Sequence, residues 1–380
     1  MRILILNYEF PPLGGGAGNA TFYLLKEFAQ YNNLKIDLIT SSIDKYKEEQ
    51  FADNIKIYYL DIGKNKNLHS QSNQDLLKYS WKSYHFAKQL ISKNNYNLIH
   101  SFFGIPCGCV AMKLKLPYLV SLRGSDVPFY SKKYFLLDKL IFKKLSKKIW
   151  RNSKAVIANS ADLKNLALES APRQKIEIIY NGIDLKEFSP NYKANKEFTI
   201  ISTSRLIKRK GIEYLIDGFI EFSKKYNNSK LFLIGDGDLE KELKEKIKRA
   251  DIQNKVDFLG VVEHCKIANF YKKSDVFILP SLNEGMSNSL LEGMASGLAI
   301  VTTDTGGSKE LIDKNNGIII EKQNSNSIFN ALEKIYLDSK LLKSMRLASR
   351  KKAEKMSWGN VAEKYFEIYK EVYVRNLRNL

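Results

Sequence analysis

The chain has 380 residues, of which 44% are hydrophobic, and it carries a formal net charge of +20. Because single hydrophobic cores stop growing beyond roughly 250–300 residues, this length predicts about two domains. No apolar run reaches the roughly 18 residues of a membrane-spanning helix, and "MRILILN" lacks the pattern of a secretory signal, so we expect a cytoplasmic protein. Cys107 and Cys109 lie in one stretch, Cys265 is far away, and the four histidines are scattered. This spacing predicts neither a disulfide framework nor a metal site.

Short apolar segments alternate with helix-compatible segments, and the alternation restarts after the polar stretch "FSPNYKANKE". Strands are expected at residues 2–7, 35–40, 55–60, 97–102, 117–122 and 155–160, and again at residues 198–204, 230–236, 256–260, 275–281, 299–304 and 316–321. This pattern predicts an α/β fold with two doubly wound, Rossmann-like domains, residues 1–190 and 191–360, followed by a helix at residues 361–380. Such sheets bind ligands at the carboxyl ends of their strands, so we expect the active site in a cleft between the domains.

A glycine-rich stretch, "NYEFPPLGGGAGNATF", follows the first expected strand and leads into a helix. Gly14, Gly15 and Gly16 allow a tight turn and a close approach of the backbone to a phosphate or sugar. The spacing is not the GxGxxG of a dinucleotide site. A turn that needs glycine only for its geometry is the alternative.

A basic loop, "STSRLIKRKGIEYL", follows the first strand of the second half. Arg205 and Lys210 stand just before a helix whose N-terminus is partly positive. Arg supplies a planar fork and Lys a mobile point charge, a pair suited to a diphosphate. A run of solvated charges is the alternative.

Two glutamates eight positions apart stand in "NEGMSNSLLEGMASG", residues 283–297. We expect Glu284 in a strand-end loop and Glu292 in a helix that begins near Ser287 or Asn288. Open amides at that helix N-terminus would bind a phosphate, and the carboxylates would accept hydrogen bonds from hydroxyl groups. A nucleotide sugar carries both a phosphate and hydroxyl groups. The alternative is that the two glutamates are ordinary surface acids. The residues expected to line the nucleotide site here are Gly285, Met286, Ser287, Asn288 and Glu292.

Residues 131–154 carry eight Lys, one Arg and a single acid, Asp138. As a helix at about 100° per residue, the segment has an apolar face and a basic face. The apolar face would hold Tyr134, Phe135, Leu137, Ile141, Phe142, Leu145 and Ile149, and the basic face Lys133, Lys139, Lys143, Lys147 and Arg151. The pattern favours either an interfacial helix on an anionic membrane or a domain helix with solvated lysines. Leu136 and Leu140 interrupt the basic face.

Over nearly its full length the chain resembles the retaining glycosyltransferases of family GT4, which have the GT-B fold of two Rossmann-like domains facing each other across a cleft. The most specific element is E-x7-E, here Glu284 to Glu292; "SRLIKRKG", "YNGIDLKEFSP" and "LIGDGDLEKEL" are similar to further family motifs. The resemblance implies that Glu284 contacts the donor sugar, Glu292 the ribose, and Arg205 and Lys210 the diphosphate. It also implies that Gly235 belongs to the nucleotide site and that the terminal helix crosses back to the first domain.

One motif departs from the family pattern. Where many members have H-G-x-D, this chain reads "LRGSDV", with Arg123 in place of the histidine and Asp126 retained. By resemblance, both positions are candidate catalytic residues. Arg123 would contact a hydroxyl, a phosphate or an acidic acceptor.

The implied reaction moves a sugar from a nucleoside diphosphate, UDP favoured and GDP possible, to an acceptor hydroxyl with retention of configuration. Fixed cations stabilise the departing diphosphate, so no metal and no cofactor beyond the donor are expected. The expected acceptor is a lipid-linked or cell-envelope glycan at the inner membrane face, with residues 131–154 on the membrane. A GT-B nucleotide-sugar epimerase and a basic nucleic-acid-binding protein are the alternatives, although no nucleic-acid module is recognisable and we expect no nucleic acid partner.

Overall fold

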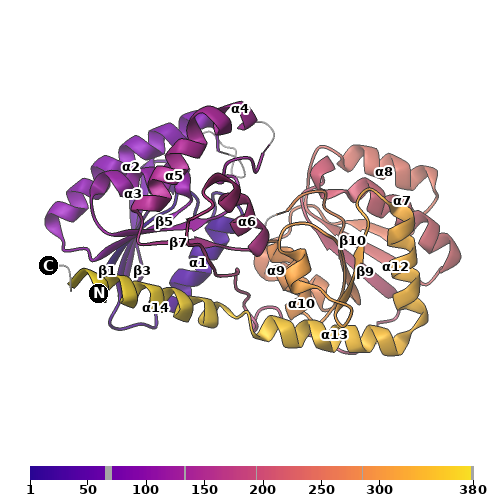
Figure 1. Ribbon diagram of the computed structural model, residues 1–380. Coiled ribbons are helices and arrows are strands. Elements are labelled where there is room, and N and C mark those ends of the chain that lie inside the picture. The colour runs from indigo at the N-terminus through magenta and orange to yellow at the C-terminus, as the bar shows by residue number, and fades with distance from the viewer. Residues whose placement is uncertain (65–70, 132–133, 194, 285, 378–380) are drawn as a thin grey trace. The chain divides into compact units, whose positions relative to one another are not determined.

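The computed structural model describes residues 1–64, 71–131, 134–193, 195–284 and 286–377 (Figure 1). The chain forms two compact units, one made of Met1–Asn181 and the chain from Trp358 onward, the other of Gly182–Ser357. Each unit is an α/β layer structure around a largely parallel sheet. The predicted fold class, two Rossmann-like domains, is therefore confirmed.

The sheet of the first unit has the strand order β3-β4-β2-β1-β5-β6-β7-β8. Every neighbouring pair is parallel except β3 with β4. Its inner strands are apolar runs buried on both faces, as parallel sheets require. The strands are β1 (Arg2–Leu6), β2 (Lys35–Ser42), β3 (Lys47–Ala52), β4 (Ile55–Asp61), β5 (Leu98–Phe102), β6 (Tyr118–Leu122), β7 (Ala155–Ala158) and β8 (Glu177–Ile178).

Helices cover both faces of this sheet. Helix α1 packs with α14 on one face, whereas α2, α3 and α5 pack together on the other (Figure 1). The helical segments are α1 (Gly16–Phe28), α2 (Asn73–Lys93), η1 (Gly104–Gly108), α3 (Cys109–Leu114), α4 (Phe135–Leu137), η3 (Asp138–Phe142), α5 (Lys143–Asn152), α6 (Ala161–Ser170) and α14 (Trp358–Leu377). Among the described residues, no helix is both long and apolar enough to cross a bilayer.

Helix α14 is held to the first unit by aromatic and polar contacts. The Trp358 ring stacks on Tyr23 with centroids 5.7 Å apart. Further along, the Tyr369 hydroxyl lies 2.7 Å from Nδ1 of His100, whose Nε2 lies 2.8 Å from the Ser121 hydroxyl. Burial, and to a smaller degree the charge of Arg123, holds the pKa of His100 well below its ordinary value of 6.5. His100 is therefore a neutral, fully buried part of the core at neutral pH.

The second unit has a sheet of order β11-β10-β9-β12-β13-β14, all parallel. Helices α7, α8 and α12 cover one face and α9, α10 and α13 the other. The strands are β9 (Phe198–Thr203), β10 (Ser229–Ile234), β11 (Val256–Phe258), β12 (Val276–Leu279), β13 (Ala299–Thr303) and β14 (Gly317–Ile320). The helical segments are η4 (Lys208–Lys210), α7 (Ile212–Lys225), α8 (Glu240–Arg249), η5 (Gln253–Lys255), α9 (His264–Tyr271), α10 (Asn288–Ala295), α11 (Ser308–Leu311), α12 (Ser325–Leu337) and α13 (Ser339–Glu354).

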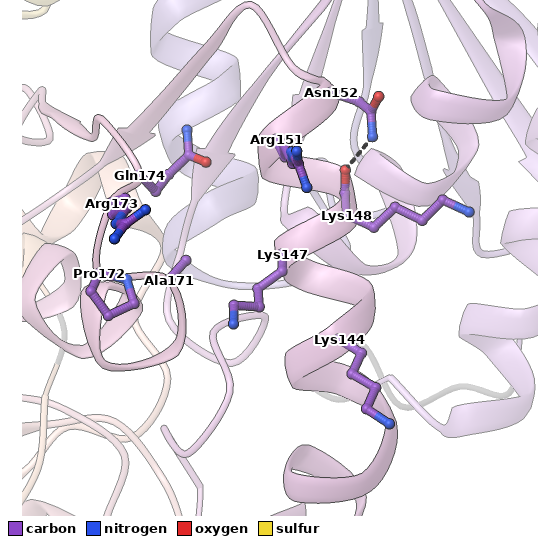
Figure 2. Close-up of a pocket in the computed structure, with 9 residues that line it drawn as sticks. All are labelled: Lys144, Lys147, Lys148, Arg151, Asn152, Ala171, Pro172, Arg173 and Gln174. Atoms are coloured by element: carbon purple, nitrogen blue, oxygen red, sulfur yellow. Dashed lines mark hydrogen bonds between the residues drawn. The ribbon is translucent and has the colours of Figure 1, made fainter.

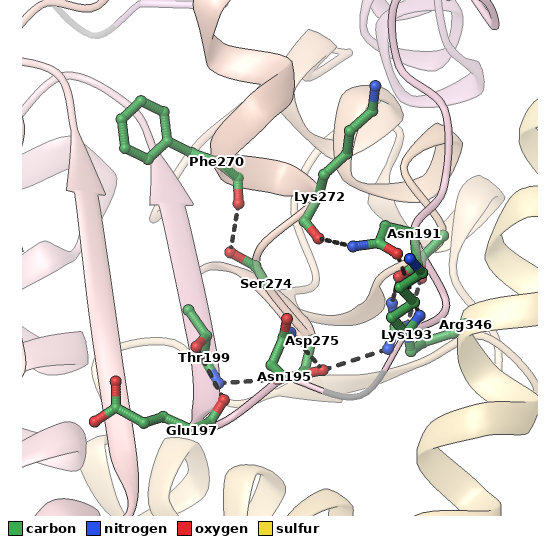
Figure 3. A network of polar contacts seen from close by, with 11 residues as sticks. Asn191, Lys193, Asn195, Glu197, Thr199, Phe270, Lys272, Ser274, Asp275 and Arg346 are labelled. Atoms are coloured by element: carbon green, nitrogen blue, oxygen red, sulfur yellow. Dashed lines mark hydrogen bonds and ion pairs between the residues drawn. The ribbon is translucent and has the colours of Figure 1, made fainter.

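A polar network at the amino edge of the second sheet fixes the segment that leads into β9 (Figure 3). Arg346 of α13 donates to the carboxylate of Asp275 at 3.3 Å and to the Asn191 carbonyl. The same carboxylate accepts from the Asn195 amide group and from the Thr199 backbone, both at 3.0 Å. Burial raises the pKa of Asp275, and these donors and Arg346 offset that rise in part. The network therefore supports the fold at the edge opposite the strand ends that carry the site.

The basic segment departs from the predicted two-faced helix. Residues 135–152 are continuously helical in α4, η3 and α5, but Asp138 and Ser146 are buried, whereas Leu136 and Leu140 are exposed. The buried Asp138 carboxylate accepts a hydrogen bond from the Phe129 backbone amide at 2.9 Å. Exposed apolar side chains are concentrated at residues 135–141, where Lys139 is also exposed, and the other exposed cations of the helix lie at residues 144–151. Lys139, Lys147 and Arg151 of the predicted basic face are exposed. Ile149 of the predicted apolar face is buried, whereas Phe135, Leu137 and Ile141 of that face are exposed. Lys133 lies outside the described residues.

Candidate active site

Glu284 lies in the loop after β12, at the carboxyl edge of the second sheet. Its Oε1 contacts the ammonium group of Lys210 and accepts a hydrogen bond from the Ser281 hydroxyl at 2.6 Å. The side chains of Lys210 and Glu284 are only 13% and 9% exposed. Such shielding strengthens a charge-assisted pair. The structure therefore joins the basic loop and the E-x7-E motif, which are far apart in the sequence, in one site.

Glycine at position 211 makes this pairing possible. Gly211 has φ +65°, and a Cβ atom there would lie 2.2 Å from the carbonyl oxygen of Pro280. On the other side of the same contact, the Leu282 amide donates to the Arg209 carbonyl at 2.8 Å. The loop after β9 and the loop after β12 are thus locked together backbone to backbone, which brings Lys210 to Glu284.

Gly235 packs against the backbone of the basic loop. It has φ +127°, and a Cβ atom there would lie 2.1 Å from the Ser204 carbonyl oxygen. The next residue, Asp236, accepts a hydrogen bond from the Leu206 amide at 2.6 Å. This segment therefore fixes the backbone on both sides of Arg205. The Arg205 side chain is exposed and makes no ion pair within the described part of the chain, which leaves its guanidinium available to an anion.

Helix α10 begins where the sequence places it. Ser287 is the N-cap, its hydroxyl accepts from the Leu290 amide at 3.4 Å, and the first helical residue is Asn288. Met286, which precedes the cap, is buried. Gly285 lies outside the described residues. The partial positive charge of the helix N-terminus stands next to the loop that carries Glu284.

Glu292 is buried in the second turn of α10 and belongs to a chain of hydrogen bonds. Its Oε2 accepts from the Tyr271 hydroxyl at 3.0 Å, and that hydroxyl lies 2.6 Å from the Thr203 hydroxyl. Burial, and then the charge of Glu292, raises the pKa of Tyr271 well above its usual range, so the phenol stays protonated as a donor. Tyr271 and Thr203 were not predicted, because "NFYKKSD" carries no spacing typical of a site. Only the position of Thr203 at a strand end signals such a role.

In the first unit, the glycine-rich turn wraps around a carboxylate. Oε2 of Glu9 accepts from the Gly15 amide at 3.3 Å. Gly14 has φ +93°, and a Cβ atom there would lie 2.6 Å from that of Glu9. Helix α1 then begins at Gly16. Burial raises the pKa of Glu9. Glu9 was not predicted, although its place two residues beyond a predicted strand was a usable signal.

Asp126 organises the neighbouring strand ends of the first sheet. One carboxylate oxygen accepts from the Gly104 amide at 2.7 Å, and the other from the amides of Arg123 and Gly124 at 2.9 and 3.0 Å. Burial raises the pKa of Asp126, while these three donors act in the opposite direction. The side chain therefore joins the end of β5 to the loop after β6.

Arg123 contacts three different parts of the first unit. Its guanidinium carbon lies 4.5 Å from the centre of the Phe102 ring. One terminal nitrogen donates to the Asn181 side chain at 2.8 Å, and the other to the Tyr365 hydroxyl at 3.5 Å. Asn181 is the last residue of this unit before the chain enters the second. Arg123 thus connects β6, helix α14 and the point at which the chain leaves the unit.

Two family models match the chain. Residues 14–187 match "Glycosyltransferase Family 4" and residues 184–352 match "Glycosyl transferases group 1". An uncharacterized glycosyltransferase of Methanocaldococcus jannaschii is 26% identical over 379 residues, covering 98% of this chain and 99% of the relative.

A relative from Campylobacter jejuni is 32% identical over 227 residues, which are 57% of this chain and 60% of the relative. Its name is N-acetylgalactosamine-N,N'-diacetylbacillosaminyl-diphospho-undecaprenol 4-alpha-N-acetylgalactosaminyltransferase. Among solved structures, Anabaena HepE in complex with UDP-glucose has a TM-score of 0.70 and 19% sequence identity over the full length of both chains.

Two Rossmann-like units with charged loops at their strand ends define the GT-B class of glycosyltransferases. The two family models together span most of the sequence, one on each unit. The chain belongs to the GT4-type glycosyltransferases.

Proposed function

We propose that this glycosyltransferase moves a sugar from a nucleoside diphosphate to an acceptor hydroxyl with retention of anomeric configuration and without a metal ion. The observation that carries the proposal is the shielded contact of Lys210 with Glu284, beside the N-terminus of α10. A cation, a carboxylate and a helix N-terminus in one place match the phosphates and hydroxyl groups of a nucleotide sugar.

In this proposal the charges act on the departing diphosphate. As the bond to the sugar breaks, negative charge develops on the phosphate oxygens, and Lys210, Arg205 and the α10 N-terminus stabilise it. Their positions are set by the backbone contacts of Gly211 and Gly235, so little reorganisation is needed when the charge develops. Fixed cations thereby take the place of a metal ion.

The two glutamates bind hydroxyl groups of the donor. Glu284 accepts from the sugar and Glu292 from the ribose, with Tyr271 holding the Glu292 carboxylate in place. UDP is the favoured nucleotide, supported by the similarity to a structure that contains UDP-glucose, and GDP is the second choice. In the first unit, Gly15, Gly16 and Arg123 lie at strand ends where they would contact the donor or the acceptor, and Asp126 holds their loops.

We propose a lipid-linked or cell-envelope glycan as the acceptor, used at the inner face of the cytoplasmic membrane. The Campylobacter jejuni relative, whose name includes a diphospho-undecaprenol, supports this choice. So do the exposed apolar side chains at residues 135–141, because large apolar groups in contact with water mark interaction surfaces.

The direct test is a transfer assay with UDP-sugars and a polyprenyl-diphosphate glycan in the presence of a chelator. We expect UDP release only when the acceptor is present, and NMR of the product to show the donor's anomeric configuration. Inversion, or a strict requirement for a divalent cation, would contradict the mechanism. UDP release without the acceptor would favour the epimerase alternative.

A further inference from the structure

A hollow of about 940 Å³ lies between α5 and the segment that follows α6 (Figure 2). Five of its nine lining residues are Lys or Arg, and none is Asp or Glu. Four of the cations come from α5 and one from residues 171–174, so two separate elements supply the charge. We call this hollow the α5 basic pocket; its cations are Lys144, Lys147, Lys148, Arg151 and Arg173.

These five cations are not explained by ion pairs within the protein. In the part of the chain that the structure describes, none of them pairs with a carboxylate. Helix C-termini favour cations, which accounts for Lys148 and Arg151 in the last turns of α5. It does not account for Arg173, which lies beyond the end of α6 yet lines the same hollow. Five like charges around one concave surface create a strongly positive potential, and such a surface attracts a multiply charged anion.

The pocket is separate from the strand ends of the first unit. Helices α5 and α6 each lead into a parallel strand, β7 and β8, so their C-terminal ends lie at the amino edge of the sheet. Gly15 and Arg123 follow β1 and β6 and therefore lie at the carboxyl edge. An anion in the pocket would not occupy the place of the donor or of the reacting hydroxyl.

Exposed apolar side chains continue the same run of helix in the N-terminal direction. Leu136 and Leu140 are 72% and 66% exposed, and Phe135, Leu137 and Ile141 are exposed beside them. At about 1.5 Å per residue, Leu140 and Lys147 are about 10 Å apart along the axis. A helix that enters the membrane by its N-terminal end, with its axis near the membrane normal, converts this separation into a difference in depth. Apolar residues in the acyl layer then place the cations of α5 at the level of the lipid phosphates.

We infer that the α5 basic pocket binds the phosphate of an anionic phospholipid head group while residues 135–141 enter the acyl layer. The inference deepens the proposed membrane-bound acceptor and rests on it. It adds a lipid site distinct from the donor site. Arg supplies the fork that grips phosphate oxygens, and the neighbouring lysines supply point charge.

The test compares two pairs of substitutions that remove the same charge from the full-length protein. Lys147→Ala with Arg173→Ala removes one pocket cation from α5 and one from residues 171–174. Lys113→Ala with Lys154→Ala removes exposed cations of the same unit that neither line the pocket nor belong to residues 135–141. Binding is measured by flotation with phosphatidylcholine vesicles, with and without phosphatidylglycerol.

A cation near an anionic surface contributes about fivefold to affinity, so Lys147→Ala with Arg173→Ala should weaken binding to phosphatidylglycerol vesicles about 25-fold. The control pair, which leaves the pocket cations in place, should weaken binding much less. An equal loss for both pairs would show that only overall charge matters and would overturn the pocket. Leu136→Ser with Leu140→Ser should also release the protein from vesicles.

Three further outcomes distinguish a lipid phosphate from a soluble phosphate, and failure of this inference from failure of the proposed function. Calorimetric binding of inorganic pyrophosphate that Lys147→Ala with Arg173→Ala abolishes, together with no vesicle binding, would assign the pocket to a soluble ligand and overturn the lipid. If vesicles do not bind while UDP still stabilises the protein, this inference fails and the donor assignment stands. If UDP has no effect either, the proposed function fails with it.

Discussion

Lys210 and Glu284, from loops after two neighbouring strands of the second sheet, meet in a contact that is almost closed to water. The Ser281 hydroxyl donates to the same carboxylate oxygen that Lys210 contacts. The Glu284 carboxylate thus holds the Lys210 side chain and, through Ser281, its own loop. The pair links the group that would stabilise the diphosphate to the group that would bind the sugar.

Glu284→Gln should abolish most of the activity with limited loss of stability. The amide keeps the shape of the carboxylate but removes its charge, so we expect turnover to fall at least about 100-fold. Loss of the charged hydrogen bonds should lower the free energy of unfolding by about 1.5–3 kcal/mol. Steady-state kinetics and urea unfolding measure the two effects. Glu242→Gln, an exposed carboxylate on α8, is the matched control, and near-normal turnover by Glu284→Gln would refute the role of Glu284.

Lys210→Ala should lower kcat/KM by about 100- to 1,000-fold, because a fixed cation at a developing negative charge is lost. Arg205→Ala should act in the same direction. Arg209→Ala should have little effect, since the backbone carbonyl of Arg209, rather than its side chain, holds Leu282. Steady-state kinetics of the three variants measure these effects. Equal losses of kcat/KM for Arg209→Ala and Lys210→Ala would show that the total charge of the loop matters rather than the position of Lys210.

Tyr271→Phe should weaken nucleotide binding without a large change in turnover. The substitution removes the hydroxyl that lies between Thr203 and Glu292, and one lost hydrogen bond of about 1 kcal/mol corresponds to about fivefold in affinity. Titration calorimetry with UDP measures it. Tyr226→Phe removes a similar contact, between Tyr226 and Glu333 at 2.7 Å, away from the site. If both variants bind UDP like the unmodified protein, Glu292 does not depend on Tyr271.

His100 should make the protein less stable as the pH falls below 6.5. Its pKa is lowered in the folded state, so below pH 6.5 the unfolded chain binds a proton that the folded chain does not. The free energy of unfolding then falls with decreasing pH, by at most about 1.4 kcal/mol per pH unit, from pH 6.5 down to the lowered pKa. Above pH 6.5 this residue contributes no pH dependence.

Urea unfolding on both sides of pH 6.5 measures this effect. His100→Gln should flatten the pH dependence, even if it lowers stability at every pH. His85→Gln, at an exposed position, should keep the slope of the unmodified protein. An unchanged slope in His100→Gln would contradict the assignment.

Much of the fold could be predicted from hydrophobic patterning. The buried parallel strands are continuous apolar runs, and all twelve predicted segments contain strands of the two sheets. Strand β3, "KEEQFA", was not predicted, because an edge strand that is half exposed carries charges where a buried strand carries valine or isoleucine. Strand β8 has only two residues and is too short to show a period.

The candidate site could be predicted in part. Glu284, Glu292 and Lys210 stand in motifs, but sequence spacing does not show that Lys210 contacts Glu284, because that contact depends on two loops locked through Gly211. Tyr271 escaped prediction since its hydroxyl reaches Glu292 from a different helix. The exposure of Leu136 and Leu140 agrees with their predicted place on the basic face, whereas nothing in the sequence indicated that Asp138 is buried, because its partner is the backbone of Phe129.

The measurement that tests the central claim most directly is the free energy of unfolding with and without UDP, in the presence of a chelator, for the unmodified protein, Lys210→Ala and Arg209→Ala. At about 100 times its dissociation constant, UDP should stabilise the unmodified protein and Arg209→Ala by about 2.7 kcal/mol, and Lys210→Ala much less. Stabilisation by GDP instead of UDP would change only the base assigned to the donor. No stabilisation by any nucleoside diphosphate, or stabilisation that a chelator removes, would contradict a donor site built on fixed cations.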